Sequence, residues 1–153
     1  MEPRVDPNLH LSPLNMADEP ATTTYSIPEP FDEAVTSLRR VLAEAGLKIT
    51  GELDLSGHLQ RRLLVDTPPC LVLFAGPATP VLHGPSGHPG AAALAPLHIV
   101  VSAHGSQTEI HVMRIPPPHD GLPDASAMAL LGRFRAQLSQ AIEKIGMRAV
   151  LRA

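Results

Sequence analysis

Cysteine and aromatic residues are scarce in this chain of 153 residues. It has one cysteine, Cys70, one tyrosine, three phenylalanines and no tryptophan. A single cysteine excludes an internal disulfide and a cysteine-rich zinc site. Few aromatic rings leave few surfaces on which nucleic-acid bases could stack. The net charge of -3 also gives no basic surplus for a phosphate backbone, so we expect no nucleic-acid partner.

Long apolar runs and known catalytic motifs are also missing. No run approaches the roughly 20 apolar residues that span a bilayer. The acidic, proline-broken residues 1–20 lack the apolar centre of a secretory signal. We therefore expect a cytoplasmic protein without a membrane partner. No glycine-rich phosphate loop, GxSxG, HExxH or CxxC motif occurs, so the sequence leaves open whether the protein is an enzyme.

The clearest structural pattern is a helix that begins at Phe31. Apolar residues recur from there at spacings of three and four up to Ala45, which is typical of an amphipathic helix. Pro30 suits the start of a helix, where its missing N–H donor is not needed. Gly46 can end the helix in a left-handed conformation.

Two strands are predicted around this helix. Residues 47–54 alternate in polarity, which predicts that Leu53 is buried while Glu52 and Asp54 lie on the polar face. These carboxylates serve either solubility or a site, as an acid–base pair or as metal ligands. Ala21–Ile27 is rich in β-formers and predicts an earlier strand. Strand, helix and strand together predict a βαβ unit, with both strands parallel in one sheet.

The middle of the chain predicts a short helix, a central strand and a loop. Ser56 is a plausible N-cap for a helix over Gly57–Leu64. The continuously apolar Cys70–Phe74 predicts a strand covered on both faces. His83–Pro96 is rich in glycine and proline, so we expect a mobile loop.

A β-hairpin is predicted over Leu97–Ala103 and Glu109–Ile115, with Gly105 and Ser106 at its turn. A two-residue turn makes the numbers of paired residues sum to 211, which places Val100 opposite His111. One face then carries Leu97, Ile99, Val101, Ile110 and Val112. The other face carries His98, Ser102, Glu109, His111 and Met113. The two histidines become diagonal neighbours within reach of each other.

The last third of the chain predicts a long helix that runs to about Ile145 and ends at Gly146. Met147–Leu151 then adds a strand or frays. We therefore predict an α+β fold: a compact single domain over residues 21–153, with a mixed β-sheet covered by helices and a long C-terminal helix. Residues 1–20 are expected to form a flexible arm.

Several short strings resemble the bacterial family called domain of unknown function 302. They are Phe31-Asp32-Glu33, Glu44-Ala45-Gly46-Leu47, Glu52-Leu53-Asp54, Gly76-Pro77 and Pro96, within residues 24–117. The resemblance implies a compact α+β domain, commonly a homodimer, and no established activity. Many members carry cysteines where this chain has Ala75 and Leu97, so any thiol chemistry of the family does not transfer directly.

Two kinds of function remain open. The first is a small dimeric domain that binds a small molecule or has an accessory role, without a reaction of its own. The alternative is an enzyme or cofactor-binding protein that uses the histidine face of the hairpin. His98, His111 and Met113 are possible ligands for haem iron or a transition metal. Glu52, Asp54 or Glu109 could orient a ligand histidine. Without a metal, His98 or His111 could act as a general base, and Glu52 is a further candidate catalytic residue. An ordinary solvated sheet face explains the same residues without any site.

Overall fold

The structure, a computed structural model, describes residues 22–77, 97–113 and 125–149. Its elements in chain order are β1 (Thr22–Ile27), α1 (Phe31–Glu44), β2 (Leu47–Asp54), α2 (Leu55–Leu63), β3 (Cys70–Pro77), β4 (Leu97–His104), β5 (Gln107–Met113), α4 (Ala125–Glu143) and β6 (Met147–Arg148). The arm expected over residues 1–20 and the loop expected over residues 83–96 lie outside the described residues.

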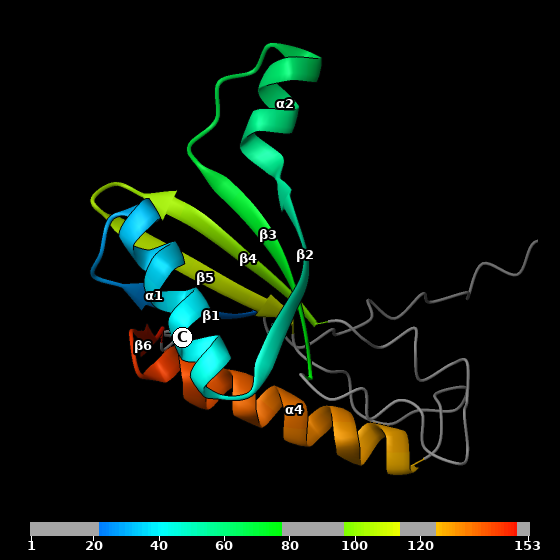
Figure 1. Ribbon diagram of the computed structural model, residues 1–153. Helices are drawn as coiled ribbons and strands as arrows, with labels where there is room; N and C mark the ends of the chain where they lie inside the picture. Colours follow the sequence, from blue (N-terminus) through cyan, green and yellow to red (C-terminus); the bar gives the residue numbers. More distant parts are fainter. Residues whose placement is uncertain (1–21, 78–96, 114–124, 150–153) are drawn as a thin grey trace, which may run out of the picture.

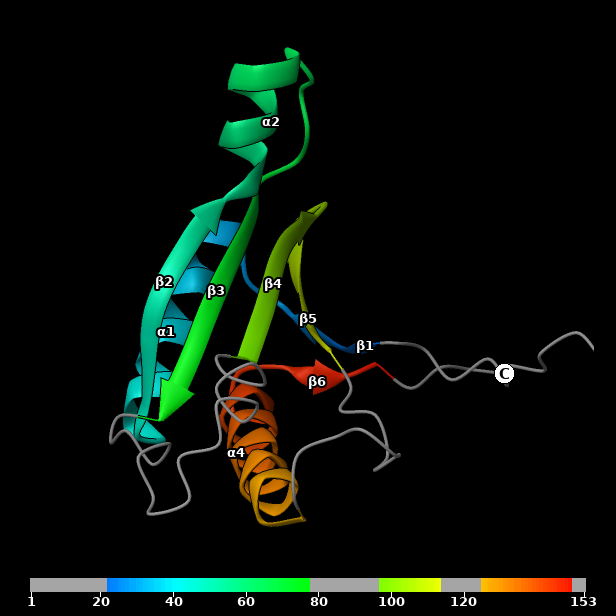
Figure 2. The ribbon, with the colours of Figure 1, turned by 90° about the vertical axis from the view of Figure 1, so that its right-hand side faces the viewer.

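The described strands form one sheet in the order β2-β3-β4-β5-β1-β6. Every neighbouring pair is antiparallel. Helices α1 and α4 contact each other and pack against one face of this sheet, while α2 projects beyond its end (Figures 1 and 2). The predicted α+β class and the long C-terminal helix are therefore confirmed.

The arrangement of β1 and β2 differs from the predicted mixed sheet. The two strands run in the same direction within one sheet, but β3, β4 and β5 lie between them. No parallel pair forms among the described strands, because β1 pairs with β5 and β6 instead of β2. Helix α1 therefore connects β1 to β2 across the three strands that lie between them.

The hydrophobic core lies between the sheet and the two long helices. From the sheet it takes Tyr25, Ile27, Leu47, Leu73, Ala75, Leu97, Ile99, Val101, Ile110 and Val112. From the helices it takes Ala34, Leu38, Val41, Leu42, Leu131, Phe134, Leu138, Ala141 and Ile142. Burial alternates along β4 and β5, so their polar residues other than Thr108 lie on the open face.

The predicted hairpin register is confirmed. Val100 pairs with His111 and Ser102 with Glu109, so paired numbers sum to 211. Gly105 has a φ of 63°, a left-handed conformation that glycine adopts without strain in a two-residue turn. Gly46 has a φ of 74°, so the predicted left-handed end of α1 is confirmed as well.

A β-bulge in β2 corrects the predicted alternation of that strand. Ile49 pairs with Ala75 and Gly51 with Phe74, which leaves Thr50 without a partner. One extra residue reverses the faces of the residues that follow it. Leu53, predicted to be buried, is 42% exposed. Glu52 correspondingly turns toward α1.

The beginning of α2 also differs from the prediction. The helix starts at Leu55, and its N-cap is Asp54, whose Oδ1 accepts a hydrogen bond from the backbone N–H of Gly57 at 2.9 Å. Ser56 Oγ donates to the same carboxylate at 2.9 Å, so the residue expected as the cap instead supports it. No residue of α2 is buried.

Candidate functional site

His111 is the centre of a polar cluster on the open face of the sheet. Its Nδ1 lies 3.1 Å from Thr24 Oγ1. Its Nε2 lies 3.4 Å from Ser102 Oγ and 3.4 Å from Glu109 Oε2. The antiparallel register brings these groups together, because His111 pairs with Thr24 on one side and with Val100 on the other. Its side chain is half-buried, so the ring is held in place while remaining accessible.

None of the hydrogen bonds or ion pairs of the described residues joins His98, Met113 or Glu52 to His111. His98 is exposed, and its ring packs edge-on against Phe74 with centroids 5.1 Å apart. Met113 is exposed at the end of β5. Glu52 lies on the helix side of the sheet, where its Oε2 is 2.6 Å from Arg39 Nη2. Among residues 22–77, 97–113 and 125–149, no group of three or more His, Cys, Asp and Glu is arranged to hold a metal ion.

Cys70 opens β3 and is half-buried. Burial raises the pKa of its thiol above the ordinary value of 9.0, and the negative charge of Asp54 raises it further. The thiolate is the reactive form of cysteine, so this environment makes Cys70 a poor nucleophile near neutral pH.

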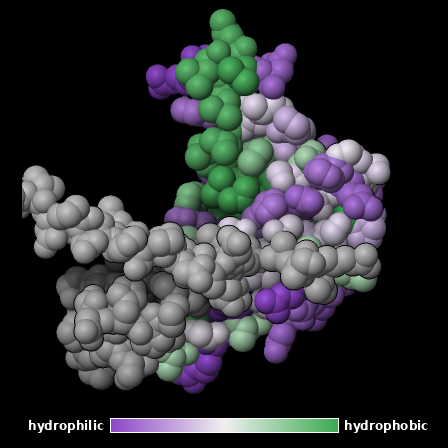
Figure 3. All heavy atoms as spheres, turned by 180° about the vertical axis from the view of Figure 1, so that it is seen from behind, coloured by the Kyte–Doolittle hydropathy of each residue, from purple (hydrophilic) through white to green (hydrophobic). Residues whose placement is uncertain are grey.

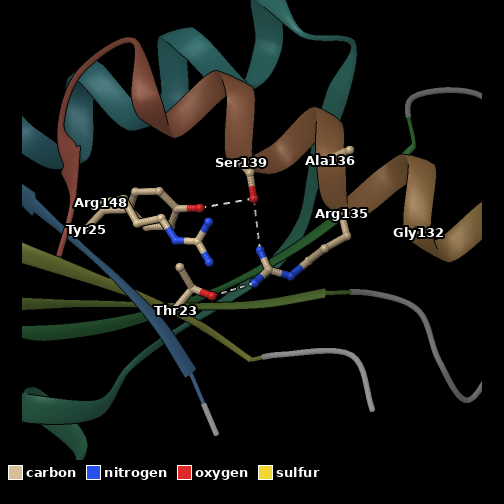
Figure 4. A pocket seen from close by; sticks show the side chains of 7 residues that line it. All are labelled: Thr23, Tyr25, Gly132, Arg135, Ala136, Ser139 and Arg148. Carbon is tan, nitrogen blue, oxygen red and sulfur yellow. Dashed lines mark hydrogen bonds between the residues drawn. The ribbon is translucent and has the colours of Figure 1, made fainter. Parts of the chain in front are cut away.

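A pocket of about 310 Å³ lies between β1, β6 and α4 (Figure 4). Its lining residues are Thr23, Tyr25, Gly132, Arg135, Ala136, Ser139 and Arg148. Two guanidinium groups and three hydroxyl groups contribute to this lining, and none of the seven residues carries a carboxylate. None of the site residues expected from the sequence lines this pocket.

Hydrogen bonds fix the pocket wall. The hydroxyl of Tyr25 donates to Ser139 Oγ at 3.0 Å. Arg135 donates from Nη1 to Ser139 Oγ and from Nη2 to Thr23 Oγ1, each at 3.1 Å. Arg135 therefore bridges α4 and β1, and Figure 4 shows the guanidinium of Arg148 directed into the same space.

Local geometry explains why these residues meet. Arg135 and Ser139 are four residues apart, so they lie on one face of α4. Thr23 and Tyr25 are two residues apart in β1 and share a face of the sheet. Arg148 in β6 pairs with Tyr25 in β1, so the two residues lie side by side. Thr23 and Tyr25 are only 7% and 1% exposed, so their hydroxyl groups form a buried wall of the pocket.

A second pocket of about 300 Å³ lies at the base of α2 and includes Asp54, Asp66 and Thr67 in its lining. Asp54 is already occupied as the cap of that helix. Thr67 Oγ1, also in this lining, is buried without a hydrogen-bond partner among the described residues. The pocket beside α4 is the stronger candidate for a binding site, because two guanidinium groups contribute to its lining.

Fold and sequence comparisons define the class of this protein. The sequence model of the family described as domain of unknown function DUF302 matches residues 23–145. The chain therefore belongs to the DUF302 family. It is similar in fold to an uncharacterised conserved DUF302 protein from Bacillus stearothermophilus, known from a crystal structure, with a TM-score of 0.67 at 15% sequence identity. The match covers 83% of this chain and 99% of that one. No curated protein matches the chain.

Proposed function

We propose that this DUF302 domain binds a small molecule in the pocket beside α4 and has an accessory role without a reaction of its own. The main support is the buried polar wall formed by Thr23 and Tyr25. A few polar groups held at fixed positions orient a bound molecule and give specificity, so a pocket lined in this way is suited to a specific ligand. The volume of about 310 Å³ is at the lower end of small-molecule sites, which favours a ligand of few atoms.

Filling the pocket tests this proposal. A Cβ added at Gly132 meets no atom within 4 Å, so the variant Gly132→Leu can place a side chain in the pocket without disturbing the helix backbone. In ligand-observed NMR with a library of small fragments, we expect binders to the unaltered chain that Gly132→Leu no longer binds. The control Gln140→Leu adds a similar side chain at an exposed position of α4 outside the pocket lining. No binders, or equal binding by both variants, would contradict the proposal.

We also propose that the domain forms a homodimer through the apolar surface of β2 and α2. This surface includes Leu53, Leu63, Leu64 and Val65, which are 42%, 64%, 89% and 47% exposed. Seen from behind the view of Figure 1, apolar residues gather over α2 and the strands next to it (Figure 3). β2 is an edge strand, whose unpaired backbone groups can pair with a second copy. The resemblance to a commonly dimeric family agrees with this assignment.

An enzyme or cofactor-binding protein that uses the hairpin face is the second candidate function. The contacts of His111 with Thr24, Ser102 and Glu109 favour it, because they orient an accessible imidazole. His98 and Met113 would complete a haem or transition-metal site only after rearrangement, while His111 could act alone as a general base. An absorption spectrum and metal analysis of the purified chain test for the haem or transition-metal site. A colourless, metal-free protein with unchanged ligand binding in His98→Ala/His111→Ala would remove this candidate.

A further inference from the structure

We infer that the ligand in the pocket beside α4 carries an oxyanion, either a carboxylate or a phosphate group. This inference rests on the proposed function, since it names the chemistry of a ligand that the pocket is proposed to hold. It is carried by three properties of the pocket: an excess of hydrogen-bond donors, two arginines without an ion pair among the described residues, and a volume larger than an inorganic ion needs.

The hydrogen bonds of the wall leave donors and not acceptors facing the pocket. Ser139 Oγ accepts from both Tyr25 and Arg135, so its own proton is left to donate. Thr23 Oγ1 accepts from Arg135 and likewise keeps a proton. Each guanidinium carries five N–H donors and no acceptor. Among the described hydrogen bonds none gives these remaining donors of the wall an acceptor, and an oxyanion supplies several.

The charges that line the pocket also favour an oxyanion. The ion pairs of the described residues join Arg39 to Glu52, Arg40 to Glu44 and His111 to Glu109. Neither pocket arginine, Arg135 or Arg148, takes part in one of them. Arg135 is half-buried beside Thr23 and Tyr25, where a charge interaction is screened less than in open water.

The shape of the pocket indicates that the oxyanion belongs to a larger molecule. A volume of about 310 Å³ equals about ten water molecules at about 30 Å³ each. Gly132 and Ala136 line it from α4 with little or no side chain, next to the arginine end. The planar fork of a guanidinium matches two oxygens of a carboxylate or phosphate, so the charged group is placed at Arg135 and Arg148 and the body of the ligand along Gly132 and Ala136.

Calorimetric titration of the full chain tests this inference with four probes. They are glycerol phosphate, succinate, and the uncharged counterparts glycerol and succinamide. We expect saturable binding of at least one anion and none of the uncharged probes, and the anion that binds distinguishes phosphate from carboxylate. Arg148→Ala should weaken binding about tenfold or more, because it removes a charged donor from an exposed position. Arg135→Lys, which keeps the charge but not the fork, should weaken it less than Arg135→Ala.

The control is Arg133→Ala, which removes an exposed arginine of α4 that does not line the pocket. Equal weakening in Arg133→Ala and Arg148→Ala would show general attraction of anions and overturn the inference. Binding of the uncharged probes alone would also overturn it, while leaving the proposed small-molecule function intact. If none of the four probes binds, the oxyanion inference fails, and the fragment experiment with Gly132→Leu decides the proposed function separately.

Discussion

Asp54 shows how one side chain can define the boundary between a strand and a helix. Its carboxylate accepts hydrogen bonds from the backbone of Gly57 and the hydroxyl of Ser56. The backbone hydrogen bond is the main reason that the pKa of Asp54 lies below its ordinary value of 3.8, and the hydrogen bond from Ser56 lowers it further. Hydrogen bonds to the charged form favour that form.

This shift predicts an acid-sensitive start of α2. Because the folded pKa is the lower one, the contribution of Asp54 to stability is complete above pH 3.8 and is lost as the pH falls through the folded value. We expect the amide signal of Gly57 and the exchange protection of α2 to change in that acidic range by NMR. Asp54→Asn keeps a good cap but does not titrate, so its α2 should lack this transition. The same transition in both proteins would contradict the assignment.

Among the elements, α4 and β6 are joined through Gly146, which lies in close contact with β1. A Cβ at this position would collide with Ile27 Cδ1 and lie 2.7 Å from the backbone oxygen of Ser26. The chain after α4 therefore passes directly over the end of β1, and only glycine fits there without a shift of the backbone. This close passage brings Arg148 beside Tyr25 and so helps to form the pocket.

Two glycine substitutions test this packing. We expect Gly146→Ala to lower the free energy of unfolding by about 1–3 kcal/mol, because the added methyl group overpacks the contact. Gly132→Ala is the matched control, since its added Cβ meets no atom within 4 Å. In a helix it should raise the free energy of unfolding by up to about 1 kcal/mol. Urea unfolding measures both, and a Gly146→Ala variant as stable as the unaltered chain would refute the tight contact.

Some of these elements could be predicted from the sequence, and others could not. The hairpin register followed from local information, because Gly105 and Ser106 define the turn and the apolar pattern selects the face. The bulge at Thr50 was missed although Gly51 beside it was a local signal, since an isolated glycine in a strand pattern often marks a bulge. The pairing of Thr22–Ile27 with β5 joins segments more than 80 residues apart, for which a single sequence gives no register.

The pocket was missed for the same physical reason. It joins β1, α4 and β6, and each contributes residues that are unremarkable alone. The available signals were the four-residue spacing of Arg135 and Ser139 on one helix face and the two-residue spacing of Thr23 and Tyr25. Only the sheet order β5-β1-β6 shows that these faces meet. The histidines of the hairpin attracted attention because they are chemically distinctive, but of them only His111 has several polar contacts.

At the scale of the whole molecule, α2 stands apart from the core. Leu64 follows this helix with a φ of 54° and is 89% exposed. A residue other than glycine in this conformation costs about 1–2 kcal/mol, and such strain is often associated with function. No helix of the described residues is long and apolar enough to cross a membrane. A second copy of the chain is the partner that we propose for this apolar tip.

Sedimentation equilibrium tests the proposed dimer. We expect the unaltered chain to sediment as a dimer and the variant Leu63→Glu/Leu64→Glu as a monomer, because like charges would replace apolar contacts at the interface. The fold should persist, since α2 buries no residue in the core. The control Arg133→Glu/Gln140→Glu places the same charges on α4 and should remain dimeric. A monomeric unaltered chain, or a dimer that tolerates both variants, would rule out this interface.

Side-chain NMR measures most directly whether Arg135 and Arg148 bind one anion together. Whichever anion binds in the calorimetric titration is added to the full chain while the arginine Nε–Hε signals are recorded. We expect the signals of Arg135 and Arg148 to shift together and saturate at the same concentration, while those of Arg39 and Arg133 stay in place. No shift at Arg135 and Arg148, or parallel unsaturated shifts of all four arginines, would contradict it.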